Sequence, residues 1–228
     1  MKILCVICAR KGSTNIKNKN LKFFLGKPLI LHTINVALKS GIFDKIVVSS
    51  DSNKILKLSE KYVHYCIKRP KNISGSYSPK ILAIKHALIK SEAEYKTKFN
   101  LIFDLDVTAP LRKVIDLLKS LKTFKTKKAD MLFSVCKSRK NPYFNMVEVK
   151  NSKVKLIKKP SKAIFARQKA PKIFDINASI YIWKRKSLLN LTSFYSGKTS
   201  FYEMPVERSI DIDSLYDWKI AEFLSKNY

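Results

Sequence analysis

Short apolar runs alternate with segments of helical periodicity along most of the chain. The apolar runs predict buried strands at residues 2–9, 46–49, 64–67, 99–105 and 131–136. Between them, apolar residues recur three or four positions apart, which predicts helices at about 28–39 and around Ile55, Ile84 and Leu117. Strands that alternate with helices predict an α/β fold with a mostly parallel sheet covered on both faces. Ligands of such sheets bind beyond the carboxyl ends of the strands.

The alternation stops over residues 138–175, which are rich in Lys and Pro and contain two hairpin-like segments near 144–149 and 154–157. It resumes with a strand at 176–183 and a last helix at 215–224. The pattern therefore predicts one core, made of residues 1–137 and 176–228, with residues 138–175 inserted as an arm.

The composition of the 228 residues, 46% hydrophobic and 28% charged, excludes a disordered chain and a disulfide scaffold. The apolar run near the N-terminus is interrupted by Arg10 and Lys11, and no later run approaches the roughly 20 apolar residues that span a bilayer. Cys5 and Cys8 have the spacing of a zinc knuckle, but they lie in a strand-like run and no second Cys or His pair lies at a matching distance, so we expect free thiols. These features predict a cytoplasmic protein without a membrane partner.

The formal net charge of +29 suggests a polyanion partner. Only seven of the 46 basic residues are Arg, and the lysines are spread along the whole chain rather than gathered in one segment. Because nucleic-acid surfaces favour clustered Arg and Lys, we expect no nucleic-acid partner and regard a basic nucleic-acid-binding protein as the less favoured alternative. The charge should still attract anionic substrates.

A polar, basic loop over residues 10–20 directly follows the first strand. Backbone N–H groups near Gly12 and Ser13 can cradle phosphates, while Arg10 and Lys19 supply positive charge. The loop is not a Walker A sequence, because no Gly-Lys-Ser/Thr opens a helix there. A merely solvated loop is the alternative interpretation.

Two Asp-x-Asp pairs are the strongest candidates for metal binding. Asp211 and Asp213 would share one face of an extended segment, with Cα atoms roughly 6.5 to 7 Å apart and Ile210 and Ile212 facing the core. Two such carboxylates can hold one Mg²⁺ whose other ligands are water and phosphate oxygens. Asp104 and Asp106 repeat the spacing at a strand end, and a helix-capping role is the alternative for the later pair.

Taken together, the motifs resemble the CMP-sialic acid synthetases, the cytidylyltransferases that activate acidic nine-carbon sugars. The resemblance covers nearly the whole chain in collinear order and rests on Ala9-Arg10-x-Gly12-Ser13-x-x-Ile16-x-x-Lys19-Asn20-Leu21, Gly26-Lys27-Pro28-Leu29-Ile30, Val47-Val48-Ser49-Ser50-Asp51, Arg69-Pro70, Thr108-x-Pro110-Leu111-Arg112, Asn177-Ala178-x-Ile180-Tyr181-Ile182 and Ser209-Ile210-Asp211-Ile212-Asp213.

This resemblance implies a Rossmann-like three-layer nucleotidyltransferase fold whose arm builds a homodimer and helps to complete the neighbouring sugar site. It implies a reaction in which the anomeric hydroxyl of a nonulosonic acid attacks the α-phosphate of CTP and expels pyrophosphate. The residues expected to bind CTP are Arg10, Ser13, Lys19, Asn20 and Arg69. Mg²⁺ is the implied cofactor, on Asp211 and Asp213, and the residues expected to act in catalysis are Arg10, Lys19, Asp211 and Asp213.

Departures from the family pattern concern the sugar site. Asp106-Val107 replaces the usual Gln ahead of Thr108, and Phe144 lies in a stretch where sialic acid enzymes often present a Lys. The residues expected to bind the sugar acid are Asp106, Thr108, Phe144, Arg167, Gln168 and Asn177. These changes favour the branch that acts on legionaminic or pseudaminic acid. A glycosyltransferase that uses a nucleotide sugar and a D-x-D metal site is the alternative enzyme.

Overall fold

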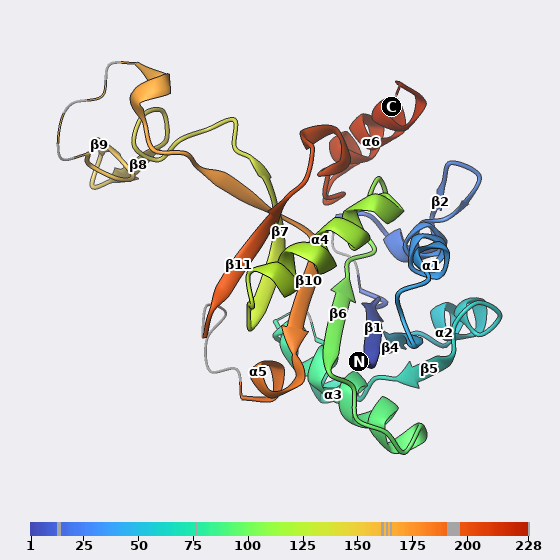
Figure 1. Cartoon of the computed structure of the whole chain (residues 1–228). Helices are drawn as coiled ribbons and strands as arrows, with labels where there is room; N and C mark the ends of the chain where they lie inside the picture. Colours follow the sequence, from blue (N-terminus) through green and yellow to red (C-terminus); the bar gives the residue numbers. More distant parts are fainter. Residues whose placement is uncertain are drawn as a thin grey trace.

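The computed structural model describes residues 1–12, 15–75, 77–160, 162, 164, 166–190 and 197–227. Seven strands form the main sheet in the order β11-β7-β10-β6-β1-β4-β5 (Figure 1). Their bounds are β1 Ile3–Cys8, β4 Lys45–Ser50, β5 Tyr65–Lys68, β6 Leu101–Leu105, β7 Met131–Lys137, β10 Phe174–Lys184 and β11 Thr199–Glu203. Only β10 runs antiparallel to its neighbours, so the expectation of a mostly parallel sheet is confirmed.

Both faces of the sheet are covered by helices. The helices are α1 Leu29–Ser40, α2 Asn53–Ser59, α3 Lys80–Glu94, α4 Val114–Thr126, α5 Arg185–Leu189 and α6 Leu215–Asn227. Along β1, Ile3, Cys5 and Ile7 pack in a core with α1, α2, α4 and α6, while Leu4 and Val6 pack in a second core with α3 and α5. Side chains alternate between the two faces of a strand. A continuous apolar run such as that of β1 therefore predicts burial on both faces, and the three-layer Rossmann-like fold is confirmed.

Local signals explain where the helices begin and end. The Ser52 side chain caps α2 by accepting a hydrogen bond from the Ile55 N–H at 3.4 Å, whereas Asp51 accepts from the Lys11 N–H at 2.7 Å. Gly41 ends α1 with a φ of 65°, a left-handed conformation that glycine adopts without strain. Within the described residues, no helix is long and apolar enough to cross a membrane. All four cysteines are free, as expected.

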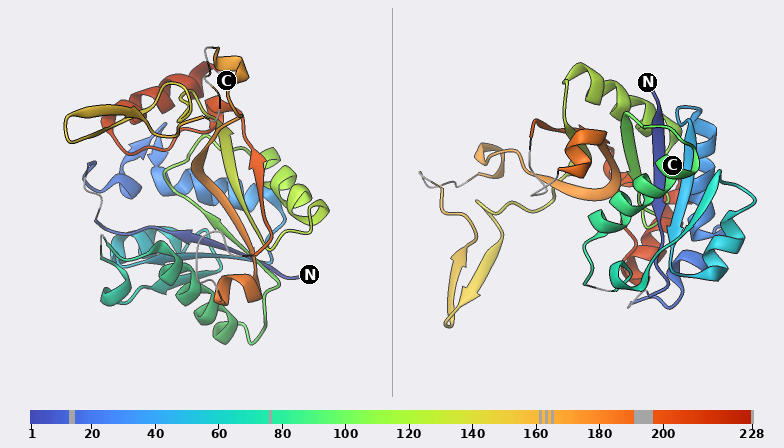
Figure 2. Two further views of the ribbon diagram at one scale, coloured as in Figure 1. Left: turned by 90° about the vertical axis from the view of Figure 1, so that its left-hand side faces the viewer. Right: turned by 90° about the horizontal axis from the view of Figure 1, so that it is seen from below.

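The segment between β7 and β10 leaves the body of the molecule (Figures 1 and 2). It carries the antiparallel hairpin of β8 Val147–Lys150 and β9 Lys153–Leu156, whose residues are all exposed. Asn151 and Ser152 turn the chain with φ values of 50° and 61°, as a two-residue hairpin turn requires. The hairpin prediction is confirmed, while β10 begins at Phe174, two residues before the predicted start of this strand at 176.

The strand β11 and the helix α5 are among the elements that were not predicted. The edge strand β11 mixes polar and aromatic residues that are partly exposed, so it lacks the apolar run of an interior strand. The short helix α5 begins directly after β10 and buries Leu188 against the second core. Two strand pairs, β2 Phe23–Phe24 with β3 Lys27–Pro28 and the arm hairpin, lie outside the main sheet.

Candidate active site

A cavity of about 300 Å³ opens beyond the carboxyl ends of β1, β5 and β6. This is the edge of the sheet where an α/β fold binds ligands. Its lining comprises Cys8, Arg10, Asn15, Lys19, Asn20, Arg69, Ile73, Gly75, Ser78, Lys80, Ala83, Asp106, Val107, Thr108 and Asp213. Seven residues expected at the site therefore come together here, namely Arg10, Lys19, Asn20, Arg69, Asp106, Thr108 and Asp213.

The first loop is held in place from two sides. The buried amide of Asn20 donates to the Arg10 carbonyl at 3.0 Å, and Asp51 accepts from the Lys11 N–H at 2.7 Å. The chain then turns into the single turn η1 Lys19–Leu21, preceded by Asn18 at a φ of 55°. Asn20 is thus the anchor of the loop as well as part of the cavity wall. Ser13 lies outside the described residues.

Lys19 connects this loop to the segment of residues 209–214, which we call the acid segment. Its ammonium donates to the Ile212 carbonyl at 2.6 Å and to the Asp213 carboxylate at 3.2 Å. The Lys19 side chain is 12% exposed, whereas the Asp213 side chain is 71% exposed. One cation and one open carboxylate therefore face the same cavity from segments far apart in the sequence.

Asp211 lies deeper than Asp213. Burial raises the pKa of its carboxyl to about 6; the hydrogen bond from Thr108 opposes this rise, and the charge of Asp213 adds to it. Its Oδ1 atom is buried and has no hydrogen-bond partner. Thr108 also holds the acid segment through its carbonyl, which accepts from the Ile212 N–H at 2.8 Å. An orphaned buried carboxylate oxygen beside an exposed carboxylate fits a hard cation such as Mg²⁺.

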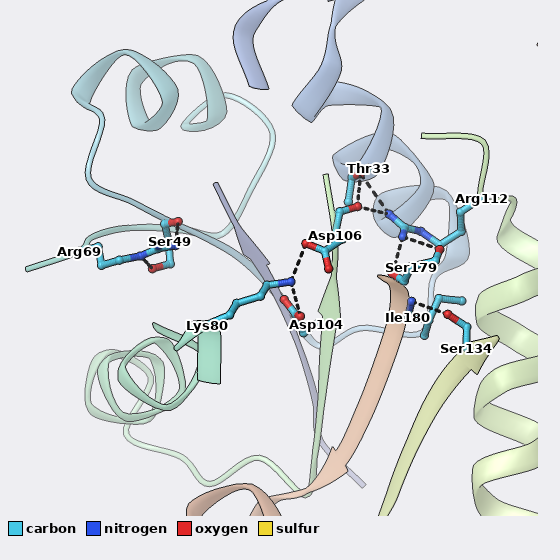
Figure 3. A network of polar contacts seen from close by, with 10 residues as sticks. All are labelled: Thr33, Ser49, Arg69, Lys80, Asp104, Asp106, Arg112, Ser134, Ser179 and Ile180. Carbon is cyan, nitrogen blue, oxygen red and sulfur yellow. Dashed lines mark hydrogen bonds and ion pairs between the residues drawn. The ribbon is translucent and has the colours of Figure 1, made fainter. Parts of the chain in front are cut away.

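Arg69 occupies the floor of the cavity and is only 6% exposed. Its guanidinium donates to the Ser49 carbonyl at 2.8 Å and to the Ser49 hydroxyl at 3.2 Å (Figure 3). The backbone N–H of Arg69 donates to the Ser50 carbonyl at 2.8 Å, which fixes the position of this residue just after β5. The side chain is thus pre-organised by β4 before any ligand arrives.

Lys80 is a cavity residue that was not predicted. Its ammonium lies 2.6 Å from Asp104 Oδ2 and 2.6 Å from Asp106 Oδ1 (Figure 3). Burial disfavours the charge on Lys80, but the two carboxylates outweigh burial and raise its pKa. The Asp104–Asp106 pair, considered for a metal, is therefore already bridged by an ammonium group. The spacing of the two aspartates carries no signal for this lysine.

Arg112 lies in the connection between β6 and α4, and its burial there was not predicted. The guanidinium is buried and donates to the Ser179 carbonyl at 2.6 Å, to the Thr33 hydroxyl at 3.1 Å and to the Asp106 carbonyl at 3.1 Å (Figure 3). Burial lowers its pKa to about 10. Arg112 thereby connects α1, β10 and the residue after β6, Asp106, which lines the cavity.

The other expected sugar-site residues lie elsewhere. Arg167 and Gln168 line a second cavity of about 600 Å³ at the root of the arm, which shares no lining residue with the first. Phe144 lines neither cavity. Asn177 is 4% exposed and also lines neither, and its amide is engaged by other residues of this chain. Among the described residues, no cluster of three or more His, Cys, Asp or Glu could hold a metal ion.

Comparisons with known proteins identify the family of the chain. The family model described as cytidylyltransferase matches residues 4–225. The chain is 40% identical over 98% of its length to the post-translational flagellin modification protein B of Campylobacter coli, covering 95% of that protein. It is 39% identical to the CMP-N,N'-diacetyllegionaminic acid synthase of Campylobacter jejuni, covering 97% of this chain and 94% of that protein.

A pseudaminic acid cytidylyltransferase of Campylobacter jejuni is 32% identical over 99% of this chain and 97% of its own length. Among solved structures, CMP:2-keto-3-deoxy-manno-octonic acid synthetase in complex with CTP superposes with a TM-score of 0.74 at 16% identity. That superposition covers 100% of this chain and 99% of the solved one. At this identity the structural likeness concerns the fold.

Proposed function

The chain belongs to the cytidylyltransferase family, and from this premise we propose that it transfers CMP from CTP to the anomeric hydroxyl of a nonulosonic acid. The observation that carries the proposal is the joining of the basic first loop to the acid segment in one cavity through Lys19. Phosphoryl-type transfer depends on positioning and on neutralising phosphate charge, and this cavity offers both. Membership of the family decides against the glycosyltransferase and nucleic-acid-binding alternatives.

Arg10, Lys19 and Arg69 supply the positive charge that would hold the triphosphate, and Asn20 keeps the first loop in its shape. The sugar hydroxyl oxygen forms a bond to the α-phosphorus, the bond from that phosphorus to the bridging oxygen breaks, and pyrophosphate leaves. The hydroxyl proton passes to a base at the site. Lys19 stands where charge accumulates on the phosphates, so it stabilises the transition state as well as the bound nucleotide.

Asp211 and Asp213 would hold a Mg²⁺ ion. The orphaned Oδ1 of Asp211 and the open carboxylate of Asp213 supply the hard oxygen ligands that this ion requires. When bound, the ion neutralises charge on the phosphate oxygens. Asp211→Asn and Asp213→Asn should each nearly abolish pyrophosphate release with the fold intact by circular dichroism. Wild-type activity in both variants would contradict the metal assignment.

We propose N,N'-diacetyllegionaminic acid as the sugar substrate, in line with the 39% identity to a synthase of that name against 32% to a pseudaminic acid enzyme. Asp106 and Thr108 in the first cavity, with Arg167 and Gln168 in the second, are the described residues proposed to contact it. Phe144 and Asn177 line neither cavity, so a substrate contact by either remains a prediction. Because the second cavity lies at the root of the arm, we propose a homodimer in which arms complete the sugar sites. Free thiols and the use of CTP favour work in the cytoplasm.

The test is pyrophosphate release from CTP and Mg²⁺ with a panel of acids: N,N'-diacetyllegionaminate, pseudaminate, N-acetylneuraminate and Kdo. ATP, GTP and UTP serve as nucleotide controls. CTP-dependent release with diacetyllegionaminate as the fastest substrate is expected. Fastest release with N-acetylneuraminate would contradict the choice of sugar, and no release with any of the acids would contradict the proposed reaction.

A further inference from the structure

Asn177, expected from its motif to contact substrate, lies inside the protein between the sheet and the acid segment. It belongs to β10 at a point where the pairing with β7 shifts register between Ile176 and Tyr181. Ala178 follows with a φ of 47°, so the strand bulges here. The bulge turns the Asn177 side chain away from regular pairing and into a polar cluster with Ser134 of β7 and Ser209 of the acid segment.

The polar groups of this cluster satisfy one another. The Asn177 oxygen accepts from the Ser134 hydroxyl at 2.6 Å, and that hydroxyl accepts from the Ile180 N–H at 2.8 Å (the latter contact is drawn in Figure 3). The Asn177 nitrogen donates to the Ser209 hydroxyl at 2.9 Å and to the Met204 sulfur at 3.4 Å. Both N–H groups of the amide are therefore used, and the residue is 4% exposed. No donor is left for a ligand.

Ser209 connects this polar cluster to the segment that carries the two carboxylates. It lies two residues before Asp211, and its hydroxyl donates to the Pro205 carbonyl at 2.7 Å, which closes the turn that leads into the acid segment. Further along the segment, Thr108 and Lys19 hold Ile212 by its backbone, as described above. Asp211 thus lies between two fixed points, and the first of them depends on Asn177.

We propose that Asn177 is a positioning residue for the metal site: through Ser209 it sets where the Asp211 carboxylate lies, without touching the sugar or the nucleotide. The inference rests on the proposed function, because it concerns the carboxylates assigned to Mg²⁺ there. The bond network explains why a small amide is required, since its oxygen and its nitrogen face hydroxyl groups on two different segments.

The test measures metal binding apart from turnover. Mn²⁺ is titrated into wild type, Asn177→Ala, Ser209→Ala and the double variant, and free Mn²⁺ is followed by electron paramagnetic resonance. We expect the Mn²⁺ dissociation constant to rise about fivefold or more in each single variant. The double variant should be no worse than the more affected single one, because both act through the same contact. Ser120→Ala, which removes another buried serine hydroxyl outside the cluster, should leave the constant unchanged.

Steady-state kinetics separate positioning from contact. The KM for the sugar acid should stay within twofold of wild type, while the Mg²⁺ concentration for half-maximal activity rises with the Mn²⁺ constant. A sugar KM raised fivefold with unchanged Mn²⁺ affinity would make Asn177 a contact residue and overturn the proposal. Unchanged Mn²⁺ affinity in Ser209→Ala, the variant that removes only one oxygen and is safest for folding, would also overturn it. Absence of Mn²⁺ binding in the wild type would instead contradict the metal assignment of the proposed function.

Discussion

Lys19 meets two segments at once, with its backbone in the first loop and its ammonium on the Ile212 carbonyl and the Asp213 carboxylate. A ligand phosphate would compete with Asp213 for this ammonium. Lys19 therefore holds the two segments together and would also supply positive charge to a bound phosphate. Lys80 differs, because its buried ammonium is already engaged by Asp104 and Asp106.

Lys19→Ala should lower kcat/KM for CTP by an amount that corresponds to a rise of roughly 2 to 4 kcal/mol in activation free energy. This is the scale of a lost preorganised electrostatic contact. Initial-rate measurements of pyrophosphate release at varied CTP test this. Lys22→Ala is the matched control, since Lys22 is exposed, lies three residues further on and faces the Trp218 ring rather than the cavity. Equal losses in the two variants would remove Lys19 from the site.

Asp104 makes the free energy of unfolding depend on pH. Burial raises the pKa of its carboxyl to about 6 from an ordinary 3.8, against the opposing charge of Lys80. The folded protein thus binds this proton more tightly than the unfolded chain does, so the contribution is largest at low pH and is lost as pH rises through about 6. Asp104→Asn should reduce the decline in the free energy of unfolding between pH 5 and pH 8 by about 1.4 kcal/mol, because one pH unit of the titration lies between pH 5 and the pKa of about 6.

Thermal unfolding at pH 5 and pH 8 measures this difference, which corresponds to roughly 3 to 6 °C in Tm for a chain of this size. Asp130→Asn is the control. Hydrogen bonds from Lys184 and the Lys198 N–H lower the pKa of Asp130, so its titration lies below this pH window. A wild-type slope that persists in Asp104→Asn would contradict the assignment.

At the scale of elements, the acid segment is fixed by its neighbours on either side. Ahead of it, the turn η4 Val206–Arg208 is tied to α4 by Arg208, which donates to both oxygens of the fully buried Asp116 at 2.8 and 3.0 Å. Behind it, Asp217 in the first turn of α6 accepts from the Ser214 N–H at 2.7 Å. These contacts hold a segment without regular structure in place, as the proposed metal site would require.

Arg208→Met should lower the free energy of unfolding by roughly 3 to 5 kcal/mol, because it leaves the Asp116 carboxylate buried without a counter-charge. Urea denaturation measures this loss. Glu207→Gln removes a partly exposed carboxylate 3.9 Å from the same guanidinium and should cost less than about 1 kcal/mol. If both variants lost the same small amount, the Asp116 contact would not hold the turn.

At the scale of the whole molecule, the arm stands away from the body (Figure 2). Its hairpin carries exposed apolar side chains. Val147, Val149 and Val154 are 56%, 70% and 66% exposed. An isolated two-stranded hairpin is marginally stable in water, and the proposed homodimer would let a second copy cover these valines.

Val149→Asp should shift the protein from dimer to monomer, because it would place a charge in the proposed apolar contact. Light scattering coupled to size-exclusion chromatography measures the mass of each form. Glu148→Gln, at the neighbouring position on the opposite side of the strand, is the matched control and should remain dimeric. A monomeric wild type would contradict the homodimer.

The sequence by itself determined the alternation of strands and helices, and it singled out the basic first loop and the acid segment, which Lys19 joins in the structure. These features are local: apolar runs, periodicities and short motifs are set by residues within a few positions of one another. The family resemblance followed from the same local motifs in their order.

Only the tertiary structure decided which polar groups meet. Lys80 neutralises the first Asp-x-Asp pair, and the buried Arg112 donates to Ser179, 67 residues away. Asn177 bonds to Ser209 of the acid segment and lines neither cavity. Such contacts join segments far apart in the chain, and spacing along the sequence carries no signal for them. Which polar groups are buried, and with which partners, is settled only when the layers pack together.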